Sequence, residues 1–95
     1  MAFEILLAPE AVRDMNRLRA NLRAEVRDAI ERHLRNRPSM ISKARIKRLR
    51  GVSQPQFRLR VRDVRVFYDV RNNEVHVLAI VSKEHAEGWL REVGK

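Results

Sequence analysis

Four arginines recur at short spacing near the middle of the chain, and most of them alternate with apolar residues. They are Arg58, Arg60, Arg62 and Arg65. A period of two directs Arg58 and Arg60 to one face of a strand and apolar residues such as Leu59 to the other. Guanidinium groups bind phosphate in a bidentate manner and remain charged. Arginines held on a rigid strand therefore predict a surface that binds phosphate groups.

Positive charge is concentrated in the same part of the chain. Thirteen Lys or Arg residues lie between Arg32 and Arg71, against two acids, Asp63 and Asp69. This segment alone carries +11, whereas the whole chain carries +9, so the two ends are slightly acidic. Such an uneven distribution indicates an anionic partner, either a nucleic acid or an acidic protein.

A second group of basic residues precedes the arginine strand, in a segment that contains Pro, Ser and Gly. Residues of this kind suit contact with an RNA backbone, which is independent of sequence and weakens with salt. A simply solvated loop is the alternative interpretation. The candidate RNA contacts in this segment are Lys43, Arg45, Lys47, Arg48 and Arg50.

His85 is the candidate for proton transfer, because imidazole titrates near neutral pH. Lys83 and Glu84 flank it, and Glu84 could orient the ring or itself serve as the base. The alternative is that His85 is an exposed helix residue without a catalytic part. His33 is expected at a helix end, where it would interact favourably with the helix dipole, and His76, between two valines, is expected to be structural.

Length and composition indicate one domain over residues 1–95 with a modest core. The chain has no cysteine, so disulfides and thiolate chemistry are excluded. Its three histidines lack metal-ligand spacing, and we expect neither a metal nor another cofactor. No apolar run approaches the roughly 20 residues that span a bilayer, and no secretory signal is evident. These features favour a cytoplasmic protein.

The elements that position these residues follow from periodicity and turn signals. We expect a helix that begins at Pro9, a second helix capped by Asn21 and ending at Asn36, and a loop over residues 38–56. Strands are predicted over Phe3–Leu7, Phe57–Arg62, Val64–Arg71 and Val75–Ser82, and a closing helix over Glu84–Val93. The order β-α-α-β-β-β-α predicts an α+β fold, with an antiparallel sheet packed against an N-terminal helical hairpin. Tyr68 is expected in the core, and Trp89 is expected to anchor the last helix.

Three segments together resemble the RelE/ParE superfamily of bacterial toxins. They are RLRG (Arg48–Gly51), FRLRVRDVRVFYDV (Phe57–Val70) and EVHVLAIVSKEHAEGWL (Glu74–Leu90). No single segment is a strict signature, but the combination is specific and the order of elements is also that of the family. Members are toxins of type II toxin–antitoxin modules. Those like RelE cut messenger RNA, usually on the ribosome, and those like ParE poison DNA gyrase.

The resemblance implies roles for individual residues. In the RNA-cleaving branch, the ribose 2′-hydroxyl attacks the adjacent phosphate without a metal, and cations stabilise the extra negative charge. By position in the motif, Arg58 and Arg60 would hold phosphate and Arg65 would stabilise the transition state. Some members use a C-terminal histidine for proton transfer, which here would be His85.

Two further cations, Arg62 and Lys83, are candidate RNA contacts. For Arg62, at the end of its strand, a solvated residue or a partner for an acidic antitoxin is the favoured alternative. The last segment lacks the tyrosine that RelE has there. This departure favours two other functions, a ParE-like toxin acting on gyrase and a degenerate member that only binds its antitoxin.

The resemblance also implies partners. They are a small antitoxin with an acidic or amphipathic segment that wraps the helices or the basic face, messenger RNA and the ribosome. The toxin and its antitoxin would form a hetero-oligomer, without a membrane.

Overall fold

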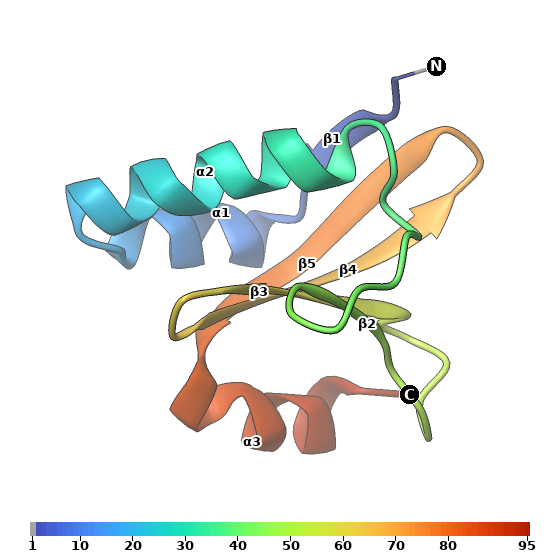
Figure 1. Cartoon of the computed structure of the whole chain (residues 1–95). Helices are drawn as coiled ribbons and strands as arrows, with labels where there is room; N and C mark the ends of the chain where they lie inside the picture. Colours follow the sequence, from blue (N-terminus) through green and yellow to red (C-terminus); the bar gives the residue numbers. More distant parts are fainter. Residues whose placement is uncertain (1) are drawn as a thin grey trace.

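Helices cover both faces of a five-stranded sheet in the computed structural model, which describes residues 2–95 (Figure 1). Helices α1 and α2 lie on one face, and α3 lies on the other. None of the helices formed by residues 2–95 has the length and apolar character needed to cross a membrane. In chain order the elements are β1 (Glu4–Leu7), α1 (Pro9–Arg17), α2 (Ala20–Leu34), β2 (Ile46–Arg48), β3 (Phe57–Val61), β4 (Val64–Arg71), β5 (Glu74–Ser82) and α3 (Lys83–Val93).

The strand order in the sheet is β1-β5-β4-β3-β2. Strands β2 to β5 pair antiparallel with their neighbours, whereas β1 pairs parallel with β5. The predicted α+β class is therefore confirmed, but the sheet is mixed rather than wholly antiparallel. The predicted loop over residues 38–56 also contains β2, which adds a fifth strand. This strand has only three residues and forms by pairing with β3, Ile46 opposite Leu59, so its own sequence gives little signal.

The boundaries of α2 differ from the prediction. The helix begins at Ala20 with Arg19 at the N-cap position and no side-chain cap. Asn21 lies inside the first turn, where its side-chain oxygen accepts a hydrogen bond from the backbone of Leu22. The helix ends at Leu34 rather than at Asn36. Arg35 is the C-cap residue, and its carbonyl accepts a hydrogen bond from the backbone of Phe3 at 2.7 Å.

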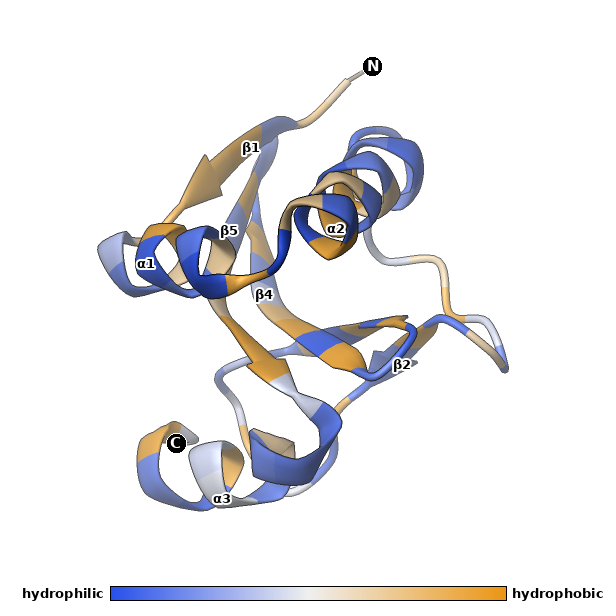
Figure 2. Cartoon of the chain, turned by 90° about the vertical axis from the view of Figure 1, so that its left-hand side faces the viewer, coloured by the Kyte–Doolittle hydropathy of each residue, from blue (hydrophilic) through white to orange (hydrophobic). Residues whose placement is uncertain are grey.

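The main core lies between the sheet and the helices α1 and α2. Figure 2 shows the apolar segments of the strands and of α2 facing one another across this layer. Tyr68 is fully buried there, as predicted, and its hydroxyl donates to the carbonyl of Pro38 at 2.6 Å. Burial raises the pKa of the Tyr68 phenol. The fully buried aliphatic residues of this core include Val26, Leu34, Leu59, Val66, Val75 and Val77.

A smaller apolar contact attaches α3 to the opposite face of the sheet. The rings of Phe67 and Trp89 are stacked with centroids 4.9 Å apart and planes inclined by 6°. The indole N–H of Trp89 donates to Glu10 at 3.0 Å. Trp89 thus anchors the last helix, as predicted, although no residue of α3 is fully buried.

Candidate functional site

Strand register brings four cations together on the face of the sheet that carries α3. Arg60 lies directly opposite Arg65, and Arg58 lies opposite Phe67, the ring that stacks on α3. On the other side of β3, Lys47 of β2 lies opposite Arg58. Directly opposed residues share one face of a sheet. We call this set, Lys47, Arg58, Arg60 and Arg65, the arginine face.

Arg65 is the most deeply placed cation of the arginine face, with 9% of its surface exposed. Its Nη1 donates to the backbone carbonyls of Arg62, at 3.0 Å, and Val64, at 3.2 Å. Desolvation, followed by repulsion from Arg60, lowers the pKa of Arg65. An arginine remains charged despite such a shift. Arg65 is therefore a fixed cation whose charge is held by neutral carbonyl groups rather than by a carboxylate.

Arg58 has an unsatisfied donor. Its Nε is buried and has no hydrogen-bond partner among the described residues. Desolvation, followed by repulsion from Arg65 and Arg60, lowers the pKa of Arg58. A buried donor without a partner costs free energy, and like charges placed together add to that cost. An anion bound on this face would relieve both costs.

Asp69, the acidic residue on the same side of β4, is hydrogen-bonded to groups outside the arginine face. Asp69 accepts hydrogen bonds from the side chain of Gln54 at 2.7 Å and from the backbone of Gln56 at 2.8 Å. It also lies 3.8 Å from Arg71. Within residues 2–95, no member of the arginine face forms an ion pair. The positive charge of this face is thus not compensated by an ion pair, and Asp63 attracts Arg65 only from beyond ion-pair distance.

His85 lies at the end of the sheet that carries Arg65. Its Nδ1 is 2.7 Å from the hydroxyl of Ser82, which lies opposite Val64 at the end of β5. The backbone of Lys83 donates to the carbonyl of Asp63 at 2.7 Å, which fixes the start of α3 to the turn between β3 and β4. The imidazole is therefore oriented by a neighbouring hydroxyl.

The sequence predicts Glu84 as the group that orients His85, whereas in the structure the neighbouring group is Ser82. The Glu84 side chain is exposed and makes no hydrogen bond within the described chain. The sequence feature that indicates this contact is a serine at the N-cap position of α3, followed three residues later by a side chain that can form a hydrogen bond.

The other predicted RNA contacts do not form one surface. Arg62 lies in the turn after β3 and pairs with Glu25 of α2, and it lines a hollow at the edge of the sheet together with Arg60 and Arg45. Arg48 lies over an aromatic ring of β3, with its guanidinium carbon 5.1 Å from the ring centroid. Lys43 and Arg45 line a cleft beside the end of α2. Arg50 and Lys83 are exposed, and Lys47 alone of the predicted loop residues joins the arginine face.

His33 lies in the last turn of α2, as predicted. Desolvation and then repulsion from Arg45 and Arg32 lower its pKa, so the neutral imidazole is favoured. His76 is 3.0 Å from Glu74 on the same strand, in keeping with a structural residue. No three His, Asp or Glu residues in the described part of the chain are grouped as metal ligands.

Comparisons with known proteins define the family and the fold of this chain. A family model described as the ParE toxin of the type II toxin–antitoxin system parDE matches residues 5–87. The chain is thus a type II toxin of the RelE/ParE superfamily. Within that class it belongs to the ParE toxin family. No protein of curated function matches the sequence.

Solved structures of RelE proteins share the fold. The toxin RelE of E. coli in the free state, a mutant, has 18% identity and a TM-score of 0.73, over 98% of this chain and 99% of that one. RelBE2 of Mycobacterium tuberculosis has 20% identity and a TM-score of 0.72, over 86% and 99%. The RelB–RelE complex of Methanococcus jannaschii has 20% identity and a TM-score of 0.69, over 88% and 96%. The latter two are structures of toxin–antitoxin complexes.

Proposed function

We propose that this toxin is a metal-independent endoribonuclease that cleaves messenger RNA and thereby inhibits translation. The observation that carries the proposal is the arginine face, where Arg58, Arg60 and Arg65 lie together without a carboxylate. A face built only to be solvated would not leave the Nε of Arg58 buried and unpaired. The unpaired donor and the uncompensated charge fit a phosphate of an RNA backbone.

The chemistry needs the chain to hold the phosphate, to stabilise negative charge in the transition state and to transfer protons. The 2′-hydroxyl of a ribose attacks the adjacent phosphorus, and the bond to the 5′-oxygen of the next nucleotide breaks. Arg58 and Arg60 hold the phosphate, and Arg65 stabilises the additional negative charge of the transition state. Preorganised cations in such positions lower the free energy of the transition state by several kcal/mol, and a single hydrogen-bond donor contributes about 3 kcal/mol.

His85 is the proposed group for proton transfer. Because Ser82 occupies Nδ1, Nε2 is the nitrogen that reaches the substrate. When Nδ1 donates to the serine hydroxyl, the neutral imidazole accepts a proton at Nε2 and acts as the base. The imidazolium, with protons on both nitrogens, donates from Nε2 to the leaving oxygen and acts as the acid. Glu84, exposed beside it, is the alternative base.

A second candidate function is the poisoning of DNA gyrase without RNA cleavage. The matching family model, which describes ParE toxins, favours it. The segment Lys83–Leu90 also lacks a tyrosine, so no phenol is available there for proton transfer. A degenerate member that only binds its antitoxin would share both features.

The test is induction of the toxin in growing cells, followed by primer extension on cellular transcripts. The variants are Arg60→Ala, Arg65→Ala and His85→Ala, and the control is Arg13→Ala on the exposed side of α1. We expect cleavage by the wild type and the control, and losses of about a hundredfold for the site variants. Circular dichroism of each purified variant excludes unfolding as the cause, and Arg60, which is exposed, keeps the test informative if Arg65→Ala unfolds.

Intact transcripts in growth-arrested wild-type cells would refute the nuclease proposal. Broken or relaxed plasmid DNA in the same cells would then support the action on gyrase. Full cleavage by His85→Ala would remove His85 from the mechanism and leave the function in place. We further propose that the protein acts in the cytoplasm, on ribosome-bound messenger RNA, and that an antitoxin inhibits it.

A further inference from the structure

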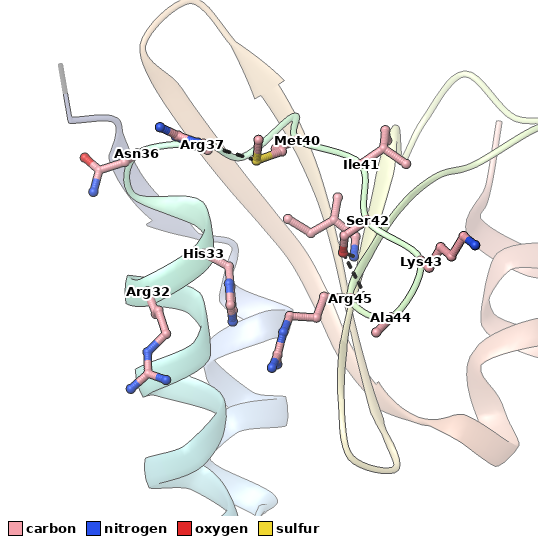
Figure 3. A pocket seen from close by; sticks show the side chains of 11 residues that line it. Arg32, His33, Asn36, Arg37, Met40, Ile41, Ser42, Lys43, Ala44 and Arg45 are labelled. Atoms are coloured by element: carbon pink, nitrogen blue, oxygen red, sulfur yellow. Dashed lines mark hydrogen bonds between the residues drawn. The ribbon is translucent and has the colours of Figure 1, made fainter.

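A cleft of about 780 Å³ lies between the end of α2 and the segment that leads into β2. It is on the α2 side of the sheet, and three of its lining residues, Arg32, His33 and Arg45, also line a neighbouring hollow that contains Arg60 of the arginine face. In Figure 3, His33 and Arg45 extend into it from opposite walls, and Met40, Ile41 and Lys43 follow the segment that forms its far wall.

The cleft carries positive charge without compensation. Of its four basic residues, Arg32 is paired with Asp28 at 3.2 Å. The other three form no ion pair within residues 2–95, and no acidic residue lines the cleft. These three are Arg37, Lys43 and Arg45. His33 is uncharged between them, because burial and the neighbouring Arg45 and Arg32 lower its pKa and Asp28 opposes them only weakly.

Exposed apolar side chains lie among these cations. Met40 is 54% exposed and Ile41 is 56% exposed. No aromatic side chain lines the cleft, so it offers no ring on which a nucleic-acid base could stack. Recognition of single-stranded RNA relies on such stacking. Aliphatic and thioether side chains ringed by cations instead complement a peptide with apolar and acidic side chains.

The walls of the cleft are held in place by hydrogen bonds. The buried hydroxyl of Tyr68 fixes the carbonyl of Pro38 to the sheet. The hydroxyl of Ser42 accepts hydrogen bonds from the backbones of Arg45, at 3.1 Å, and Ile46, at 3.2 Å. The backbone of Ser42 also donates to the carbonyl of Ile46 at 2.9 Å. A preformed wall lowers the entropic cost of binding.

We infer that this cleft docks an acidic, amphipathic segment of the antitoxin. An aliphatic side chain of that segment lies on Met40 and Ile41, and its carboxylates pair with Lys43, Arg45 and Arg37. The inference rests on the membership in a toxin–antitoxin family and not on RNA cleavage. The antitoxin therefore has an anchor that adjoins the arginine face at Arg60 but does not include Arg58 or Arg65.

The test is titration of the purified toxin with its co-expressed and separated antitoxin, by fluorescence anisotropy. Two toxin variants probe the cleft, the double charge reversal Lys43→Glu with Arg45→Glu, and Ile41→Ser. The matched control is the double reversal Arg13→Glu with Arg19→Glu, which changes the net charge equally on an exposed surface outside the cleft. We expect Kd to rise by about tenfold or more for the cleft reversal, by about fivefold for Ile41→Ser, and by less than about threefold for the control.

Three further measurements separate the alternatives. In hydrogen exchange, bound antitoxin should protect the amides of residues 41–46. Labelled oligouridine serves as a second probe. If the cleft variants lose only oligouridine and bind the antitoxin with the wild-type Kd, the occupant is RNA and the inference is overturned. Wild-type Kd for both Ile41→Ser and the charge reversal overturns it as well. Primer extension reports the nuclease activity separately, so failure of one proposal leaves the other distinguishable.

Discussion

Replacing Arg58 by Met should stabilise the free protein while it removes function. The substitution keeps an apolar stem in place of that of the arginine and removes the buried Nε that has no partner. It also removes repulsion between Arg58 and its neighbours Arg65 and Arg60. An unsatisfied buried donor costs about 1–3 kcal/mol, and because Arg58 is only half-buried we take about 1 kcal/mol. For a domain of this size that gain raises Tm by about 4–8 °C.

The assay is thermal unfolding followed by circular dichroism, at low and at high salt and with added phosphate. Salt screens exposed like charges, so the difference between Arg58→Met and the wild type should shrink as salt rises. We expect phosphate to bind the native arginine face and so to raise the Tm of the wild type more than that of the variant. Arg60→Met is the control, since Arg60 is exposed and its replacement should change stability by less than about 0.5 kcal/mol. A lower Tm for Arg58→Met, with an unchanged response to phosphate, would refute the reasoning that the arginine face is strained in the absence of an anion.

Two more predictions concern the α2 side of the sheet. Tyr68→Phe removes the donor to the carbonyl of Pro38 and leaves that carbonyl without its partner. The free energy of unfolding, measured in urea titrations, should fall by about 1–2 kcal/mol. Toxicity at permissive temperature should persist, and loss of toxicity in a folded variant would contradict a purely structural tyrosine. The folded state holds the pKa of His33 below its ordinary 6.5, through burial and then Arg45 and Arg32, with Asp28 opposing. The unfolded chain therefore takes up the proton first, and stability present above pH 6.5 is lost as pH falls through the folded-state pKa. Urea unfolding on either side of that pH should show a smaller loss for His33→Gln than for the wild type, and equal losses would place the acid sensitivity elsewhere.

The sheet part of the candidate site could be predicted from the sequence because alternation determines it. A period of two put Arg58 and Arg60 on one face, and the tight turns at Asp63 and Asn72 bring the following strands back in register. Because of this register, Arg65 lies opposite Arg60 of β3. Local pattern and short turns leave little freedom in this part of the chain.

The remaining features depend on contacts that a local pattern does not encode. Strand β2 forms by pairing with β3, which places its residue Lys47 opposite Arg58 on the arginine face, whereas Lys43, which precedes the strand, lines the cleft beside α2. The cleft beside α2 depends on Pro38 being fixed by Tyr68, a residue thirty positions away in the sequence. The alternation of strands carries no information about such a contact.

The weak attachment of α3 has a consequence for the timing of the chemistry. This helix has no fully buried residue. It is attached by Trp89 and by backbone hydrogen bonds at its two ends, from Lys83 to Asp63 and from Lys95 to Gln54, whereas the strands that carry the arginines are buried in the sheet. Elements with few buried contacts open at a lower free energy than the global unfolding of a domain. The helix carries His85, and Ser82 is its N-cap residue. The group proposed to move protons thus belongs to a less stable cooperative unit than the groups proposed to hold phosphate, and a complete site forms only while that unit is closed.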